Sequence, residues 1–154
     1  MKKSAGILMV RERSRRIEFF LVHPGGPFWK NKDAGAWTIP KGLVNPGEEA
    51  LAAARREFAE ETGFTVDGTF VPLGSFKQPG GKHVEAFAVA GDCDPEKLVS
   101  NEFEMQWPPH SGRMQRFPEV DRGAWFSEDE ARKKLLIGQQ PIIDRFLELR
   151  AAAK

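Results

Sequence analysis

The chain has 154 residues, 40% of them hydrophobic and 29% charged, so we expect a single globular domain over residues 1–154. A net charge of +1 excludes a global field that draws the protein to nucleic acid or membranes, and the lone Cys93 excludes an internal disulfide and a cysteine metal cluster. No apolar run has the length of a membrane span and no secretory signal is recognisable, which favours a cytoplasmic protein.

The first forty residues predict a β-hairpin followed by a loop. Ala5 to Val10 is a short apolar run typical of a buried strand, and Ile17 to Val22 is its expected partner across a charged turn. His23 to Pro27 contains Pro and Gly residues that disfavour helix and central strand, so we expect a loop there. Trp37 to Ile39 reads as a brief extended piece that Pro40 ends.

The next segment predicts a helix with defined ends. Asn45 is a suitable N-cap, Pro46 suits the first helical position, and Glu48 can reach back to the cap as in a capping box. The Ala-rich sequence continues to Thr62, and Gly63 supplies a C-terminal stop. We therefore expect one helix from Asn45 to Thr62.

The remainder predicts a second hairpin, an irregular stretch, a short strand and two helices. These are residues 70–76 with 84–90, then 91–122, then 124–126, then a helix with a capping box over about 127–136, and a final helix that begins at Pro141. Strands and helices intermingle along the chain. The predicted class is therefore α/β, with a mixed sheet covered by helices.

Three carboxylates crowd one face of the predicted helix. At about 100° per residue, Glu57, Glu60 and Glu61 fall within roughly 100° of arc. Like charges this close repel, and a hard cation with oxygen ligands, such as Mg²⁺, would relieve the repulsion. The alternative is an ordinary solvated face, in which Arg55 and Arg56 offset the charge through (i, i+4) pairs.

A longer pattern favours the metal site over the solvated face. Residues 42–64 match Gly-x5-Glu-x7-Arg-Glu-U-x-Glu-Glu-x-Gly-U throughout, where U is an apolar residue. This resembles the Nudix box, the signature of the Nudix hydrolases, and the order of flanking elements extends the resemblance to nearly the whole chain. The fixed positions of the pattern are Gly42, Glu48, Arg56, Glu57, Glu60, Glu61 and Gly63, and the apolar ones are Phe58 and Phe64.

The resemblance implies a fold, a cofactor and ligands. The fold is a Nudix-type α/β/α sandwich with a mixed central sheet, on which the box forms a loop–helix–loop. Glu57, Glu60 and Glu61 correspond to the ligands of a divalent metal, with the carbonyl of Gly42 as a further ligand. The expected cofactor is Mg²⁺, for which Mn²⁺ can substitute.

The same resemblance implies roles in catalysis. Arg56 would orient the carboxylates, for example by pairing with Glu60 at (i, i+4). Glu61 and Glu57 are catalytic candidates, with Glu61 as a candidate general base, although members of the family differ on which carboxylate takes the proton. For Glu48 the capping-box role is a sufficient structural explanation, and direct metal contact is the alternative.

The residues just before the box suggest a phosphate contact. Trp37-Thr38-Ile39-Pro40-Lys41-Gly42 resembles the Trp-x-x-Pro-Lys-Gly lead-in of dinucleoside polyphosphate hydrolases and of related pyrophosphatases. Lys41 would then lie beside the metal cluster, where its ammonium can meet a phosphate. The alternative for Lys41 is a solvated side chain.

Other candidate substrate contacts have weaker signals. Trp37, like the other tryptophans Trp29, Trp107 and Trp125, could stack on a base or simply pack in the core. His83 and His23 could touch phosphate or base, with a surface histidine beside a turn as the alternative. Arg113 and Arg116 could clamp distal phosphates or lie in a solvated loop.

A carboxylate from outside the box is also expected, because many Nudix enzymes add one as a ligand or base. Residues 101–107 alternate strictly, which places Glu102, Glu104 and Gln106 on one side of an extended chain. We favour Glu104 as the catalytic one, with a solvated edge as the alternative. Glu119 and Asp121 follow later and stay open as alternatives.

These observations predict a metal-dependent hydrolase of a nucleoside diphosphate linked to another moiety, with a dinucleoside polyphosphate such as Ap4A as the favoured substrate. The alternatives are hydrolysis of a (d)NTP or nucleotide sugar and a non-hydrolytic nucleotide-sensing module. The expected partner is a small nucleotide, with no DNA-binding domain and no membrane, on a monomer or homodimer.

Overall fold

The computed structural model describes residues 3–153, and its centre is a six-stranded mixed sheet. The strand order is β4-β5-β1-β2-β8, with a short β3 paired to β1. The β1–β5 pair is parallel and the others are antiparallel. The strands are β1 (Lys3–Arg13), β2 (Arg16–Pro24), β3 (Lys41–Leu43), β4 (Val71–Lys77), β5 (His83–Ala90) and β8 (Val120–Ser127).

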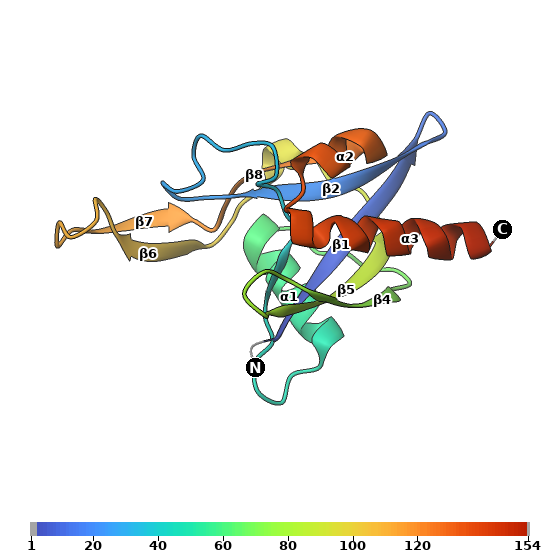
Figure 1. The fold of residues 1–154 in the computed structure, drawn as a ribbon, viewed down its shortest axis with the longest axis horizontal. Helices are drawn as coiled ribbons and strands as arrows, with labels where there is room; N and C mark the ends of the chain where they lie inside the picture. The colour runs from blue at the N-terminus through green and yellow to red at the C-terminus, as the bar shows by residue number, and fades with distance from the viewer. Residues whose placement is uncertain (1–2, 154) are drawn as a thin grey trace.

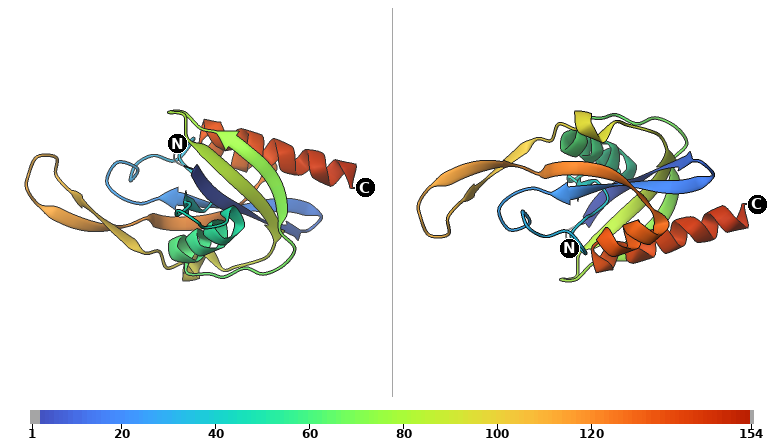
Figure 2. Two further views of the ribbon diagram at one scale, coloured as in Figure 1. Left: turned by 90° about the horizontal axis from the view of Figure 1, so that it is seen from below. Right: turned by 90° about the horizontal axis from the view of Figure 1, so that it is seen from above.

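Helices cover both faces of this sheet, which confirms the α/β prediction (Figures 1 and 2). Helix α1 (Ala50–Thr62) lies on one face, and α2 (Glu128–Lys134) and α3 (Gln140–Ala152) lie on the other. The sheet therefore separates two cores. The α1-side core includes Ile7, Met9, Phe20, Val22, Phe58 and Val120, and the α3-side core includes Leu8, Val10, Phe19, Leu21, Phe126 and Ile143.

The alternation of β1 explains why its sequence is apolar without interruption. Ile7 and Met9 point into the α1-side core, whereas Leu8 and Val10 point into the α3-side core. A strand that is buried on both faces needs an apolar residue at every position, because successive side chains leave opposite faces. The predicted hairpin of β1 and β2 is confirmed, with Val10 opposite Phe19.

The start of α1 differs from the prediction. The helix begins at Ala50, with Glu49 at the N-cap, and Asn45 is not a cap. Residues 46–47 form a turn in which Gly47 has φ +78°, a left-handed conformation that favours glycine. Glu48 still reaches back, because the Asn45 backbone N–H donates to Glu48 Oε1 at 3.0 Å. The C-terminal stop is as predicted, with Gly63 at φ 77°.

Residues 91–122 were expected to be irregular, and this was wrong. They contain a 3-10 turn η1 (Pro95–Lys97), the strands β6 (Glu102–Gln106) and β7 (Met114–Pro118), and the start of β8. β6 and β7 pair as a separate two-stranded sheet that projects from the body as an arm (Figure 1). The predicted alternation in β6 is confirmed, since Phe103 and Met105 are half-buried and their neighbours are exposed.

The C-terminal elements follow the predicted order. Ser127 caps α2 by accepting a hydrogen bond from the Glu130 N–H at 3.4 Å. A short 3-10 turn η2 (Ile137–Gln139) leads into α3, which begins one residue before Pro141 and lies along the sheet (Figure 1). Over residues 3–153 no helix is both long enough and apolar enough to cross a membrane.

Candidate functional site

The predicted box helix lies against β3, so that Gly42 of β3 lies next to Glu57 of the helix. β3 pairs with Ser4 to Gly6 of β1, and α1 packs on both strands. A Cβ placed on Gly42 would lie 2.0 Å from the Glu57 carboxyl carbon. No side chain fits in that space, so glycine at this position allows the Glu57 carboxylate to approach the backbone of β3.

Arg56 holds several of the box carboxylates. Its Nε donates to Glu48 Oε2 at 2.9 Å, and its Nη1 donates to Glu57 Oε1 at 2.8 Å and to Glu60 Oε2 at 3.2 Å. Its Nη2 donates to the Leu43 carbonyl at 2.9 Å. The pairing of Arg56 with Glu60 is as predicted. One guanidinium thus ties α1 to the turn before it and to β3.

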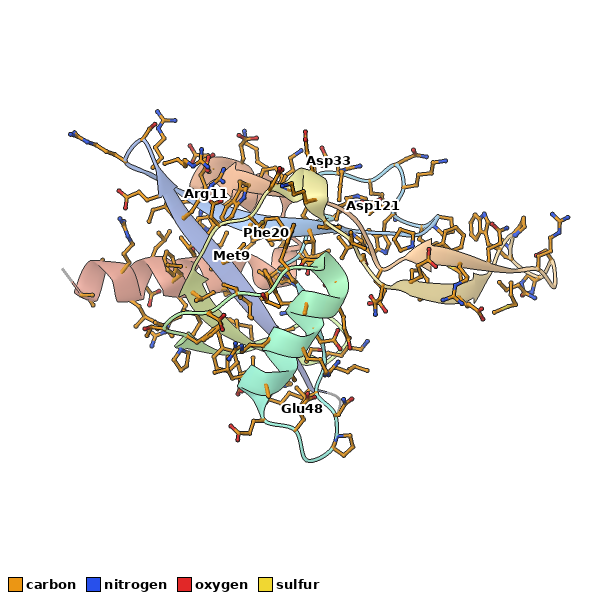
Figure 3. The ribbon with its side chains drawn as sticks, turned by 180° about the vertical axis from the view of Figure 1, so that it is seen from behind. Met9, Arg11, Phe20, Asp33, Glu48 and Asp121 are labelled. Carbon is orange, nitrogen blue, oxygen red and sulfur yellow. The ribbon has the colours of Figure 1, made fainter. Side chains whose placement is uncertain are left out.

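These contacts also explain the position of Glu48 in the pattern. The Arg56 guanidinium, helped by the Asn45 N–H, lowers the pKa of Glu48 below its ordinary value. The pKa of Arg56 is raised in turn, chiefly by its bonds to Glu48. Glu48 lies at the turn before α1 in Figure 3. Glu48 therefore holds Arg56 rather than capping a helix that starts at Asn45, and direct metal contact by Glu48 stays a prediction.

Glu61 lies in the most enclosed part of the cluster. The Lys41 backbone N–H donates to Glu61 Oε1 at 3.2 Å. Burial raises the pKa of Glu61 to about 8, an effect that Lys41 opposes and that Glu119 and Glu57 reinforce. Lys41 thus lies next to Glu61, and its contact with a phosphate stays a prediction.

Glu119 is the residue that sequence reasoning did not select. It lies between β7 and β8, and burial together with the nearby Glu57 and Glu60 raises its pKa. The Glu119 N–H donates to the Asn101 carbonyl, and the Asn101 N–H donates to the Glu60 carbonyl, both at 2.9 Å. This short chain of backbone bonds ties Glu119 to the C-terminal half of α1. No local sequence pattern signals it, since the approach depends on the chain returning from the arm.

The preferred carboxylate Glu104 is not placed with the cluster. It lies on the arm, 55% exposed, and its contact is with Arg116 Nη1 at 3.3 Å. Arg113 is in the turn at the end of the same arm and is exposed. The arm leaves the body of the molecule, so the structure corrects the expectation that Glu104 faces the metal site (Figure 2).

Trp37 is part of the core. Its side chain is 3% exposed, its ring packs at 4.9 Å from Phe126, and its Nε1 donates to Asp33 Oδ1 at 2.7 Å. A ring that is enclosed in this way cannot stack on a base, so the structure corrects the substrate-binding expectation. His83 is half-buried in β5, on the opposite side of β1 from Gly42.

The prediction that His23 lies in a loop is also wrong. His23 belongs to β2 and is 0% exposed. Its Nδ1 lies 2.8 Å from Asp121 Oδ1, and its Nε2 lies 2.6 Å from the Lys32 carbonyl oxygen. Figure 3 shows Asp121 where the chain returns from the arm into the body.

The donor chemistry of the cluster suits a divalent cation. Within residues 3–153, no three carboxylate, imidazole or thiol groups already converge to hold an ion. The reason is visible in the contacts, since Arg56 draws the Glu57 and Glu60 oxygens toward itself. Glu61 and Glu119 nonetheless carry raised pKa values because burial and like charges oppose their ionised forms. A hard cation with oxygen ligands would compensate that charge.

Comparison with known proteins identifies the family. The family model described as NUDIX domain matches residues 1–146. The chain belongs to the Nudix family. The box expected over residues 42–64 therefore lies, with its flanking strands and helices, in a genuine Nudix domain.

Curated relatives match over shorter segments. The chain is 40% identical over 63 residues to an asymmetrical bis(5′-nucleosyl)-tetraphosphatase from Caenorhabditis elegans, which is 41% of either chain. It is 42% identical over 50 residues to a putative 8-oxo-dGTP diphosphatase from Bacillus subtilis, covering 32% of this chain and 33% of the relative. These matches span less than half the length of the relatives.

A solved structure resembles the whole chain. The Ap4A hydrolase of C. elegans, in a binary complex, aligns with a TM-score of 0.65 and 24% identity over 99% of both chains. At this identity the likeness shows the fold, which confirms the Nudix-type sandwich.

Proposed function

We propose that this chain is a divalent-metal-dependent pyrophosphohydrolase that cleaves a phosphoanhydride bond in a nucleoside diphosphate linked to another moiety. The observation that carries the proposal is that Glu61 of α1 accepts from the Lys41 N–H while Glu119 and Glu57 lie near enough to oppose its ionised form, within a Nudix domain. Carboxylates this close to one another suit a polyphosphate only when a metal is also present, because carboxylates alone would repel it.

Mg²⁺, or Mn²⁺ in its place, is the proposed cofactor. Glu57, Glu60 and Glu61 would hold it, with the Gly42 carbonyl and Glu119 as further donors. The metal would neutralise charge on the phosphate oxygens and make a bound water more nucleophilic. Arg56 keeps Glu57 and Glu60 in place through its two Nη1 bonds.

Two carboxylates are candidates for taking the proton of the attacking water. Glu61 is held by the Lys41 N–H, and Glu119 approaches from the other chain segment. A carboxylate within hydrogen-bond reach of the attacking water can accept its proton. The Lys41 ammonium would meet a phosphate of the substrate.

The proposed substrate is a dinucleoside polyphosphate such as Ap4A. The support is Lys41 in its Pro-Lys-Gly lead-in, together with the similarity to an asymmetrical bis(5′-nucleosyl)-tetraphosphatase. Hydrolysis of a modified (d)NTP is the second candidate, which the similarity to a putative 8-oxo-dGTP diphosphatase favours.

A substrate panel with Mg²⁺ or Mn²⁺ tests both the class and the substrate. Ap4A, a nucleotide sugar, ADP-ribose and 8-oxo-dGTP are compared by kcat/KM and by the products released. We expect Ap4A to be preferred, EDTA to abolish turnover and Mg²⁺ to restore it. Glu61→Gln should lose at least about 10²-fold in kcat, whereas Glu96→Gln, an exposed glutamate on η1, should not. Full activity in EDTA would contradict the metal-dependent reading.

A further inference from the structure

A β-bulge lies where β8 begins, next to Glu119. His23 of β2 is opposite Arg122, but the next residue, Pro24, is opposite Val120, so Asp121 is an extra residue in β8. Bulges of this kind bend a strand and redirect its side chains.

The bulge changes the face from which the residues before it emerge. Phe126 and Ala124 lie on the α3-side core, so regular alternation would place Val120 on that face as well. Val120 instead packs in the α1-side core, where it is 3% exposed. The extra residue Asp121 thus lets Val120 pack on the α1 face, and Glu119, which precedes β8, is held by its backbone bonds to Gly25 and Asn101.

Asp121 and His23 hold the bulge from inside the fold. His23 Nδ1 lies 2.8 Å from Asp121 Oδ1 and Nε2 lies 2.6 Å from the Lys32 carbonyl oxygen, so the ring bridges these two groups. The ring is fully buried and lies against Trp37 at 5.3 Å. One imidazole therefore joins β2, the loop after it and the bulged residue of β8.

The His23–Asp121 contact, here called the brace, is connected to Glu119 through backbone hydrogen bonds. The Gly25 N–H, two residues after His23, donates to the Glu119 carbonyl at 2.9 Å, and the Glu119 N–H donates to Asn101. We propose that the contact between buried His23 and the partly exposed Asp121 is a positioning device that aims Glu119 at the glutamates of α1. This inference rests on the proposed function, in which Glu119 acts as a metal ligand or base.

The kinetic test uses a double-mutant cycle. Asp121→Ala should lower kcat at least about 10-fold, because a misplaced catalytic group is costly even when it shifts by about 1 Å. In a Glu119→Gln background the same change should lower kcat less than about 2-fold, because the group that it positions is already disabled. Asp121→Asn should keep kcat within about 3-fold of wild type, since the amide has the same shape and can still hydrogen-bond Nδ1.

A matched control separates positioning from general destabilisation. Asp144→Ala removes a side chain that pairs with Arg132 between α3 and α2, away from the bulge. Its effect on kcat should be the same in both backgrounds. If Asp121→Ala also costs the same factor in both, the brace does not act through Glu119 and the inference is overturned. Asp121→Ser, which is too short to reach the ring, replaces Asp121→Ala if that variant does not fold.

A second readout does not depend on turnover. In Asp121→Ala the amides of Gly25 and Glu119 should exchange with solvent at least about 10-fold faster, because their bonds flank the bulge, while the amide of Phe126 keeps its protection. Unchanged protection at Gly25 and Glu119 would overturn the inference. If the wild type hydrolyses no substrate of the panel, the proposed function fails, and the exchange result still decides whether the pair holds the bulge.

Discussion

Replacing Gly42 by alanine should damage catalysis while leaving the fold almost intact. The new Cβ would lie 2.0 Å from the Glu57 carboxyl carbon and 2.1 and 2.5 Å from its oxygens, and ordinary van der Waals contact begins at 3.4 Å. The Glu57 carboxylate must therefore move by more than about 1 Å, a displacement that can cost about 10²-fold in rate when it affects a catalytic group.

The stability cost of the same change should be small. The clash is with the end of a side chain that can rotate, and Gly42 is not in the left-handed region of backbone space, so alanine adopts the same conformation. Partial loss of the Glu57–Arg56 hydrogen bond is the main expense, and for a half-exposed pair this amounts to about 1 kcal/mol or less.

The assay measures kcat and the urea midpoint side by side. We expect Gly42→Ala to lower kcat about 10²-fold and the free energy of unfolding by less than about 1 kcal/mol. The double variant Gly42→Ala/Glu57→Asp should have a higher kcat than Gly42→Ala alone, because the shorter aspartate side chain no longer meets the new Cβ. Wild-type kcat in Gly42→Ala would refute the idea that Glu57 must approach β3.

Three further predictions follow from burial and capping. Burial, reinforced by Asp92, raises the pKa of the Cys93 thiol to about 11 from 9.0. At pH 8 iodoacetamide should therefore react about 100-fold more slowly with the native protein than with the unfolded chain, and the native rate should keep rising as the pH approaches 11. Equal rates at pH 8 would disprove this. Phe58→Ala should cost about 3–5 kcal/mol in urea denaturation, because the ring is 1% exposed in the α1-side core, and a loss below about 1 kcal/mol would contradict that packing. Ser127→Ala should cost about 1 kcal/mol through loss of the α2 cap, whereas Asn45→Ala should cost less, since Asn45 does not cap α1.

Local sequence was sufficient for the elements whose signals lie close together in the chain. The apolar run of β1 predicted a strand because burial on both faces requires it. The box predicted the helix and its carboxylate face because Glu57, Glu60 and Glu61 are neighbours on any helix. The contact of Arg56 with Glu60 follows from the same (i, i+4) spacing.

Local sequence gave the wrong prediction where the same residues fit two different structures. Asn45, Pro46 and Glu48 form a good helix start, yet the chain turns at Gly47 and the helix begins at Ala50, because Glu48 is engaged by Arg56 across the turn. In residues 101–107 the alternation correctly predicted a strand. It could not show that this strand leaves the body as an arm, which takes Glu104 away from the cluster.

Local sequence was enough to indicate the family, the strands with continuous apolar runs and the three glutamates of α1, because each of these signals lies within a short stretch of the chain. Only the tertiary structure decided that Glu119 joins them and that His23 is buried against Asp121, 98 residues away. Both arrangements depend on contacts between segments that are far apart in the chain. These contacts exist only once β8, with its extra residue Asp121, has paired with β2.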